Sequence, residues 1–258
     1  MLPIVTATTL QRELSSGTTK PCLFLCEADD GSKAEYVTKF RSNVRNNEAG
    51  LCFECFAVLL ARFLNVPTPE AAIVTIDANL AELVSAHNPA VGARMRASIG
   101  FNFGSRYLTG HATLPAGQSL PPATRPTATG IIAFDALIEN VDRRRINPNL
   151  LVKGSSVRAF DHETAFAFVY DFMKRSWIDK LSFLKEHALY ASLQGRDDLD
   201  LTDFLAALTS ITDTDLDSIC AAIPEDFGTS YLGPICDHVR LASAEAEDFA
   251  MALRAVLK

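Results

Sequence analysis

The chain has 258 residues, of which 48% are hydrophobic and 21% are charged, and its formal net charge is −7. This length suits one large domain or two small lobes with a sizeable core. The negative net charge argues against direct binding to nucleic acid or to anionic membranes, but it does not exclude a nucleotide ligand. The longest apolar stretch, residues 51–64, contains Glu54 and Arg62 and is too short and too charged to span a bilayer.

The N-terminus and the cysteines bear on the cellular compartment. No basic segment followed by an apolar one opens the sequence, so we expect no secretory signal and a cytoplasmic protein. In a reducing compartment the six cysteines are expected to stay free thiols. Cys52 and Cys55 form a C-x-x-C pair that could complete a zinc site with Cys22 and Cys26. Since the pair lies inside an apolar helical pattern, burial in the core is the favoured interpretation.

The first part of the chain is predicted to consist of β-strands and one helix. The apolar runs with the composition of strands are residues 21–28, 34–40, 71–76 and 101–108. Asp29-Asp30-Gly31-Ser32 joins the first two runs and is typical of a hairpin turn. Between the second and third runs, residues 48–64 form an apolar helical pattern that Asn46 and Asn47 suit as N-cap and that ends before Pro67.

The second part is predicted to be mostly helical. Residues 109–130 are rich in Pro, Gly, Ala and Thr, which indicates a connector. The expected helices after it are residues 131–140, 176–190, 202–208, 213–222 and 242–257. Two short apolar runs, residues 150–152 and 157–160, flank Lys153-Gly154-Ser155-Ser156 and predict a second hairpin.

Residues 140–152 (NVDRRRINPNLLV) contain the most informative pattern. Phosphoryl transfer from ATP needs an aspartate that orients the acceptor hydroxyl, a neutral oxygen ligand for Mg²⁺ and a second carboxylate that holds metal against the phosphates. Asp142, Asn147 and Asp161 fit these needs, because they lie on a loop before the second hairpin and at the corner after it. The alternative is structural, with Asp142 capping the loop and Asp161 pairing with an arginine of the 143–145 run.

Lys39 adds a separate observation at the end of the second predicted strand. A lysine at such a place usually extends its ammonium into water. A kinase, however, needs a fixed ammonium on the third strand of its N-lobe, held by a glutamate on the following helix. That helix supplies Glu48 and Glu54 as candidates.

Five segments in this order resemble the HipA-like kinases, which are bacterial relatives of the protein-kinase and lipid-kinase superfamily. The segments read SSGTTKPCLFL, YVTKF, FECFAVLLARFLNVP, NVDRRRINPNLLV and FDHETAF, and they cover roughly residues 10–170. The resemblance implies an α+β, two-lobed protein-kinase-like fold. Residues 1–108 would form a β-rich N-lobe with one main helix, and residues 109–258 a mostly helical C-lobe.

For the N-lobe, the resemblance implies that Lys39 binds the α- and β-phosphates of the nucleotide. Glu54 would hold Lys39, because its spacing from Leu59-Leu60-Ala61 matches the family's helix, and Glu48 is the second choice. The other nucleotide-binding candidates are Gly17, Thr18 and Lys20 in the phosphate loop, and Tyr107 and Leu108 in the segment that would hold adenine.

For the C-lobe, the resemblance implies Asp142 as catalytic base and Asp161 as metal-binding aspartate. The family's metal-binding asparagine both follows the base at a set spacing and directly precedes an apolar strand. Here the criteria separate: Asn147 satisfies the spacing and is favoured, whereas Asn149 precedes the strand. The basic run of residues 143–145 could attract the γ-phosphate or an acidic substrate, or form a solvated loop face.

The expected function is therefore an ATP- and Mg²⁺-dependent kinase that phosphorylates Ser or Thr hydroxyls of a protein, with the acceptor unidentified. A small-molecule kinase of the same fold, or a nucleotide-binding pseudokinase acting as an interaction module, would carry similar motifs. A metal-dependent hydrolase built on Asp142, Asp161 and His162 is a further alternative, but it leaves Lys39 unexplained.

Overall fold

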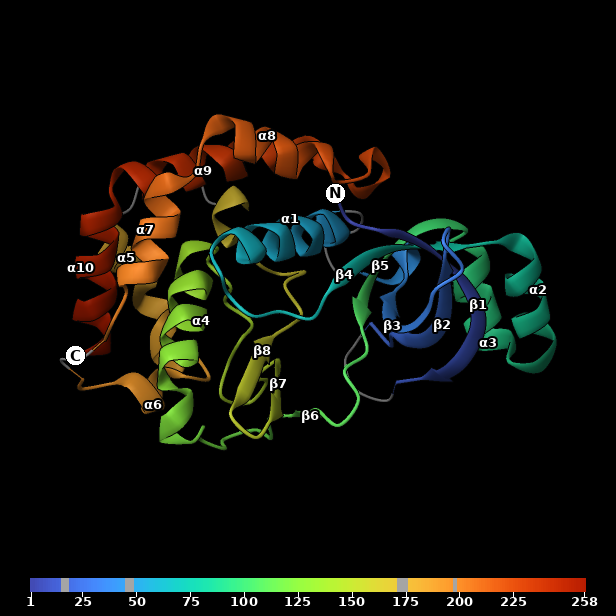
Figure 1. The fold of residues 1–258 in the computed structure, drawn as a ribbon, viewed down its shortest axis with the longest axis horizontal. Helices are drawn as coiled ribbons and strands as arrows, with labels where there is room; N and C mark the ends of the chain where they lie inside the picture. The colour runs from blue at the N-terminus through green and yellow to red at the C-terminus, as the bar shows by residue number, and fades with distance from the viewer. Residues whose placement is uncertain (15–18, 45–48, 171–175, 197–198) are drawn as a thin grey trace. The chain divides into compact units, whose positions relative to one another are not determined.

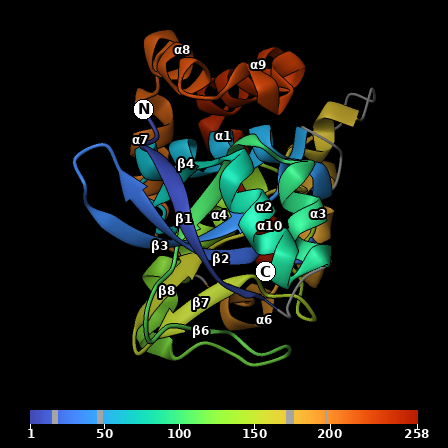
Figure 2. The same ribbon diagram turned by 90° about the vertical axis from the view of Figure 1, so that its right-hand side faces the viewer.

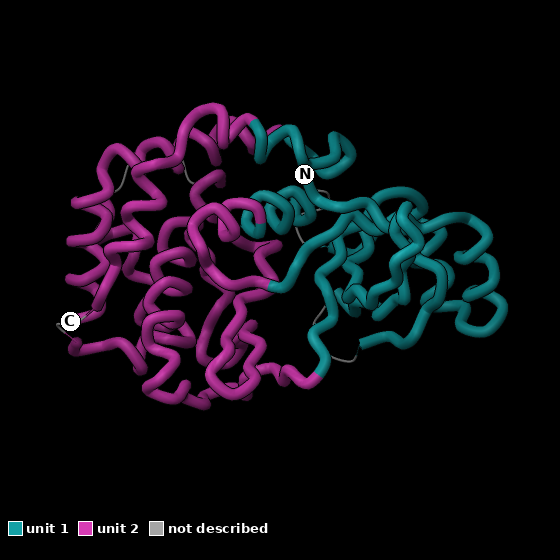
Figure 3. Tube along the Cα trace, viewed as in Figure 1, with its two compact units in different colours: residues 1–58, 69–109, 218–229 teal, residues 59–68, 110–217, 230–258 magenta. Residues whose placement is uncertain are grey.

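The computed structural model of the chain describes residues 1–14, 19–44, 49–170, 176–196 and 199–258. The chain divides into two compact units, which Figure 3 colours separately. Unit 1 comprises residues 1–58, 69–109 and 218–229, and unit 2 comprises residues 59–68, 110–217 and 230–258. The lobe bounds expected from the sequence, 1–108 and 109–258, stay a prediction.

Unit 1 contains a closed β-barrel (Figure 1). Its strands are β1 (Ile4–Glu13), β2 (Cys22–Ala28), β3 (Lys33–Lys39), β4 (Ala71–Ile76) and β5 (Gly100–Arg106). They follow the order β1-β2-β3-β5-β4, and β1 closes the barrel by pairing parallel with β4, while the other pairs are antiparallel. The four predicted strands and the β2–β3 hairpin are confirmed. The hairpin turns at Gly31, whose φ of 80° lies in the left-handed region that glycine adopts at little cost.

The helices of unit 1 differ from the prediction of one main helix. The predicted helix is present as α1 (Ala49–Phe63), which continues into unit 2, and its expected N-terminal residues Asn46–Glu48 lie outside the described residues. Between β4 and β5 the chain forms two further helices, α2 (Ala78–His87) and α3 (Pro89–Arg96), which lie side by side in Figures 1 and 2.

Both additional helices begin with capping residues. Asp77 Oδ1 accepts a hydrogen bond from the Leu80 amide at 2.7 Å, and Asn88 Oδ1 accepts one from the Val91 amide at 3.2 Å. Pro89 then occupies the first turn of α3, where its missing N–H leaves no bond unmade. The local signals for this helix pair were therefore present in the sequence.

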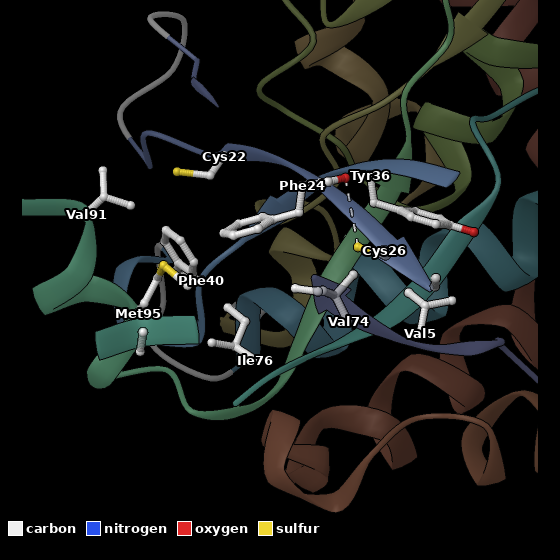
Figure 4. Packing of buried hydrophobic residues seen from close by; sticks show 13 residues of the cluster. Val5, Cys22, Phe24, Cys26, Tyr36, Phe40, Val74, Ile76, Val91 and Met95 are labelled. Carbon is white, nitrogen blue, oxygen red and sulfur yellow. Dashed lines mark hydrogen bonds between the residues drawn. The ribbon is translucent and has the colours of Figure 1, made fainter. Parts of the chain in front are cut away.

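Alternate strand residues fill the barrel, and α3 covers part of this core. Figure 4 shows the buried cluster, in which Val91 and Met95 of α3 lie near Phe40. The rings of Phe24 and Phe40 meet edge to face, with centroids 6.1 Å apart. Such burial of large apolar side chains is the main force that holds the barrel together.

The cysteines of unit 1 belong to the interior. Cys22, Cys26, Cys52 and Cys55 are all buried free thiols. Burial raises the pKa of Cys22 to about 11 and the pKa of Cys26 to about 12. Burial likewise raises the pKa of Cys52 to about 12 and that of Cys55 well above its ordinary value. Their burial agrees with the favoured interpretation of these cysteines as small apolar core residues.

Unit 2 contains a three-stranded sheet, which takes one strand from before helix α4 (Arg125–Leu137) and two strands from after it. The strands are β6 (Ala112–Thr113), β7 (Leu150–Lys153) and β8 (Ser156–Ala159), paired antiparallel in the order β6-β7-β8. The predicted second hairpin is confirmed as β7–β8. Helix α4 begins inside the predicted connector, with Pro126 in its first turn, and it ends earlier than predicted.

The remaining chain is mostly helical, as predicted. Its helices are α5 (Trp177–Lys180), α6 (Tyr190–Leu193), α7 (Thr202–Ser210), α8 (Asp213–Ala221), α9 (Leu232–Ala244) and α10 (Ala246–Leu257). Short 3-10 helices cover Arg41–Asn43, Pro122–Thr124, Ala167–Tyr170, Leu181–Glu186, Glu225–Phe227 and Thr229–Tyr231. The predicted helix 176–190 is thus divided into three pieces, and most of α9 was not predicted. Among the described residues, no helix is both long and apolar enough to cross a membrane.

Candidate active site

Lys39 and Glu54 form a buried ion pair in unit 1. Lys39 is the last residue of β3, and Glu54 lies on α1. The Lys39 Nζ atom is 2.5 Å from Glu54 Oε1, and the two side chains are 11% and 1% exposed. Of the two predicted partners, Glu54 is therefore the one that the structure brings to Lys39, while Glu48 lies outside the described residues.

The other predicted nucleotide-binding residues of unit 1 lie in two segments. Gly17 and Thr18 are outside the described residues, and Lys20 follows them as an exposed residue with a φ of 44°. Its carbonyl accepts a hydrogen bond of 2.8 Å from Arg94 Nη1. Tyr107 and Leu108 follow β5 and are half-buried, and the Tyr107 amide donates to the Glu35 carbonyl at 2.8 Å, which ties this segment to β3.

Asp142 lies on the loop between α4 and β7 in unit 2. Its amide donates to Asn140 Oδ1 at 3.4 Å, and its carbonyl accepts from the Arg144 amide at 2.9 Å. The exposed Asn147 donates from Nδ2 to Asp142 Oδ2 at 3.2 Å. Asp142 is thus a half-buried residue whose carboxylate accepts a hydrogen bond from the Asn147 side chain.

Asn149 and Asp161 lie at the same end of the β7–β8 hairpin. Leu150 pairs with Ala159, and one step further the Phe160 amide donates to the Asn149 carbonyl at 3.1 Å. Asn149 and Asp161 have φ values of 47° and 64°, in the left-handed region that Asn and Asp tolerate better than most side chains. Such backbone conformations cost free energy and are often found at functional sites.

The two candidate asparagines have different surroundings. Asn149 is 6% exposed, and its buried Nδ2 atom has no hydrogen-bond partner in the described part of the chain. Asn147 is exposed, and its main chain pairs with that of Arg144 instead of with the hairpin. Only Asn149 is therefore joined through the hairpin to the segment that carries Asp161.

The basic run of residues 143–145 was expected to attract a phosphate or an acidic substrate, or to form a solvated loop face, and one of its three residues does neither. Arg143 is 1% exposed, so it is neither on a solvated face nor available to attract a phosphate, whereas Arg144 and Arg145 are exposed. Arg143 bonds to Asp135, a fully buried carboxylate on α4 that sequence reasoning missed. An acidic residue inside the apolar helix sequence IIAFDALIEN was the available signal, because a buried carboxylate requires a partner.

The fold is similar to that of a solved kinase. The structure of a Helicobacter pylori proinflammatory kinase, CtkA, is similar to this chain with a TM-score of 0.55 and 12% sequence identity, and the match covers 98% of this chain and 99% of that one. A mutant of the Neurospora crassa PAN3 pseudokinase matches with a TM-score of 0.36 and 11% identity, over 96% of this chain and 63% of that one. No curated protein sequence matches the chain.

A family model narrows this class further. The model described as HipA-like kinase matches residues 7–233. The chain therefore belongs to the HipA-like kinase family, which confirms the resemblance found in the five sequence segments.

Proposed function

We propose that this protein is an ATP- and Mg²⁺-dependent phosphotransferase that moves the γ-phosphoryl group of ATP to a hydroxyl, most simply that of a Ser or Thr in a protein. The observation that carries the proposal is the buried Lys39–Glu54 ion pair. In protein kinases a lysine on the third strand and a glutamate on the following helix must be paired before the phosphates are bound correctly. Lys39 on β3 and Glu54 on α1 match this arrangement in strand order and in contact.

In unit 1, Lys39 would bind the α- and β-phosphates of ATP. A lysine ammonium is a compact charge on a flexible stem, so its position depends on the carboxylate that holds it. Glu54 supplies that carboxylate from a site that water scarcely reaches. Gly17, Thr18 and Lys20 would cover the phosphates, and the backbone at Tyr107 and Leu108 would hold adenine.

In unit 2, Asp142 would accept the proton of the acceptor hydroxyl, with Asn147 orienting its carboxylate. Asn149 and Asp161 would hold Mg²⁺, since a carboxylate and an amide oxygen are ligands that suit this cation. Asn149 is preferred over Asn147 because it shares the hairpin end with Asp161. When bound, Mg²⁺ neutralises charge that develops on the phosphoryl oxygens.

The acceptor class is supported by the family alone. Incubation of the purified protein with labelled ATP and a cell lysate tests both the acceptor class and the phosphotransfer itself. We expect label in one or a few proteins, as phosphoserine or phosphothreonine after acid hydrolysis. Label found only in the small-molecule fraction would replace the protein acceptor with a metabolite.

The variant Asp142→Ala tests the catalytic assignment, with Asp217→Ala on the exposed face of α8 as control. Removal of a general base costs a factor of about 10² to 10⁴ in rate, so Asp142→Ala should lose nearly all transfer and Asp217→Ala none. Equal, near-zero transfer by wild type and Asp142→Ala, with ATP binding retained, would contradict the proposal and indicate a pseudokinase.

A further inference from the structure

Arg143 is among the largest side chains that the structure buries completely. It directly follows Asp142 in the sequence, and the next two residues, Arg144 and Arg145, are exposed. A guanidinium does not lose its charge in a protein, so its burial has to be balanced by an opposite charge and by acceptors for its N–H groups.

The Arg143 side chain joins three segments of unit 2. On one side, its Nε and Nη2 atoms donate to the two oxygens of Asp135 at 2.5 Å and 3.2 Å. On the other side, Nη1 donates to the Asn149 carbonyl at 2.5 Å and to the Phe160 carbonyl at 2.9 Å. One guanidinium thus links α4 to the start of β7 and to the residue before Asp161.

Asp135 is itself fixed from two further directions. Asn140 Nδ2 donates to Oδ1 at 2.9 Å, and His187 Nε2 lies 2.9 Å from Oδ2. Because the Leu189 amide donates to His187 Nδ1 at 3.1 Å, the ring proton is on Nε2 and His187 is the donor to Asp135. All the contacts of the carboxylate therefore hold it in one orientation.

The charge states agree with this geometry. Burial alone would raise the pKa of Asp135, but the Arg143 charge and the His187 hydrogen bond outweigh it and hold the pKa well below its ordinary value. Burial lowers the pKa of His187, and the Arg143 charge adds to this, against the opposing effect of Asp135. The cluster thus consists of an ionised carboxylate, a guanidinium and a neutral imidazole.

We propose that the Asp135–Arg143 ion pair is a positioning device that sets Asn149 and Asp161 relative to each other. Neither member of the pair touches substrate in this scheme. Arg143 holds the two carbonyls on the adjacent chain segments, and Asp135 determines where Arg143 lies. The inference rests on the proposed function insofar as Asn149 and Asp161 are the metal-binding residues.

The variant Arg143→Lys distinguishes a positioning role of Arg143 from a role in charge balance alone. A lysine retains the positive charge beside Asp135, but its single nitrogen cannot bond to both carboxylate oxygens and to two carbonyls at once. Loss of a residue that orients metal ligands typically costs a factor of about 10 to 100 in metal affinity or activity. We expect Arg143→Lys to fold, to bind Mn²⁺ roughly tenfold more weakly and to lose roughly tenfold in kcat.

The matched control is Arg240→Lys. Arg240 also bonds to two carboxylates, Asp213 at 2.7 Å and Asp237 at 2.8 Å, but it is 45% exposed and lies on α9. This variant should leave Mn²⁺ binding and kcat unchanged. If Arg143→Lys fails to fold, Asn140→Ala removes one donor to Asp135 and should weaken Mn²⁺ binding by about threefold, the effect of one hydrogen bond. Its kcat is not compared, because Asn140 Oδ1 also accepts from the Asp142 amide.

Two readouts do not require turnover: Mn²⁺ binding followed by electron paramagnetic resonance, and amide hydrogen exchange of peptides covering residues 142–161. In Arg143→Lys, exchange in this segment should rise several-fold, with exchange in β2 and β3 unchanged. Unaltered exchange and unaltered Mn²⁺ affinity in a folded Arg143→Lys would overturn the positioning role. A wild-type protein without phosphotransfer would overturn the proposed function instead, and these two measurements would still decide the role of the pair.

Discussion

Two ion pairs withdrawn from water, Lys39–Glu54 in unit 1 and Asp135–Arg143 in unit 2, are the most unusual individual contacts of this protein. Removing charges from water costs several kcal/mol per ion, and the attraction between them often only offsets that cost. Burial of such a pair is therefore weak evidence for a role in stability. Its better explanation is that a charge is needed at a defined position.

This view of Lys39 and Glu54 leads to a first prediction. Either Lys39→Met or Glu54→Gln removes one member of a buried ion pair, which should lower the free energy of unfolding by about 3 kcal/mol. The double variant should lose less than the sum of the two single losses, because residues in contact do not contribute independently to stability. All three variants should be inactive in phosphotransfer, because the ammonium or its support is absent.

Urea unfolding of the four proteins checks the stabilities, and labelled ATP checks the activities. The exposed pair Lys33–Glu27, joined at 3.0 Å on neighbouring strands, supplies the control, and Lys33→Met should change stability by less than about 1 kcal/mol. Additive losses in the double variant would show that Lys39 and Glu54 do not depend on each other.

A second prediction concerns which of Asn147 and Asn149 determines the Mg²⁺ requirement. Asn149 has a φ of 47°, so glycine is the replacement that removes the side chain without straining the backbone. Asn149→Gly should raise the half-saturating Mg²⁺ concentration roughly tenfold or more, whereas Asn147→Gly should lower kcat at an unchanged Mg²⁺ requirement. Mg²⁺ titrations at saturating ATP distinguish them, and the reverse pattern would make Asn147 the metal ligand.

Among the elements, those defined by local pattern were predicted well. The β2–β3 and β7–β8 hairpins depend on short turns between neighbouring apolar runs, so both follow from adjacent residues. Residues 176–190 were predicted as one helix, but the chain forms α5, a 3-10 segment and α6 there. The segment is irregular at His187, whose ring bonds to Asp135 on a distant part of the chain, and such a contact leaves no local pattern.

The close packing of α2 against α3 leads to a prediction about stability. Gly92 of α3 packs against Ser85 of α2 so closely that a Cβ at residue 92 would lie 2.5 Å from the Ser85 Cα. Gly92→Ala should therefore destabilise the protein by roughly 1 to 3 kcal/mol through overpacking.

The matched variant Gly130→Ala should act in the opposite direction. Gly130 lies within α4, and a Cβ there would meet no described atom within 4 Å. Alanine is favoured over glycine in a helix by about 0.5 to 1 kcal/mol, so this variant should be more stable than wild type. Thermal unfolding of both variants checks the signs, and a neutral Gly92→Ala would contradict the close packing of α2 and α3.

For the whole molecule, the buried histidines predict how stability depends on pH. Burial lowers the pKa of His238 from 6.5 to about 4, and the nearby charge of Lys180 acts in the same direction. Above pH 6.5 the ring is neutral in both states. As the pH falls from there towards 4, the unfolded chain binds a proton that the folded protein does not, so stability is lost by on the order of 3 kcal/mol. His187, whose pKa is also lowered by burial, adds to this loss.

Urea unfolding at several pH values between 7.5 and 4 measures this loss. His238→Gln retains a donor for the Leu137 carbonyl, which His238 Nε2 contacts at 2.9 Å, but it has no proton to gain. Its stability should fall less steeply with acid than that of wild type, and the exposed His87→Gln should behave as wild type. An equally steep fall in His238→Gln would assign the acid sensitivity to other groups.

The sequence by itself determined the family, the hairpins and the candidates Lys39, Asp142 and Asp161, because these depend on residue type, spacing and turns between neighbouring segments. The tertiary structure decided what needs long-range contacts: closure of the barrel through the parallel β1–β4 pair, Glu54 as the partner of Lys39, and the surroundings of Asn147 and Asn149. It also moved Arg143 from a presumed basic surface into the interior. The physical reason is the same each time, since burial and ion pairing join residues that are far apart in the chain, and a one-dimensional pattern does not record which distant groups meet.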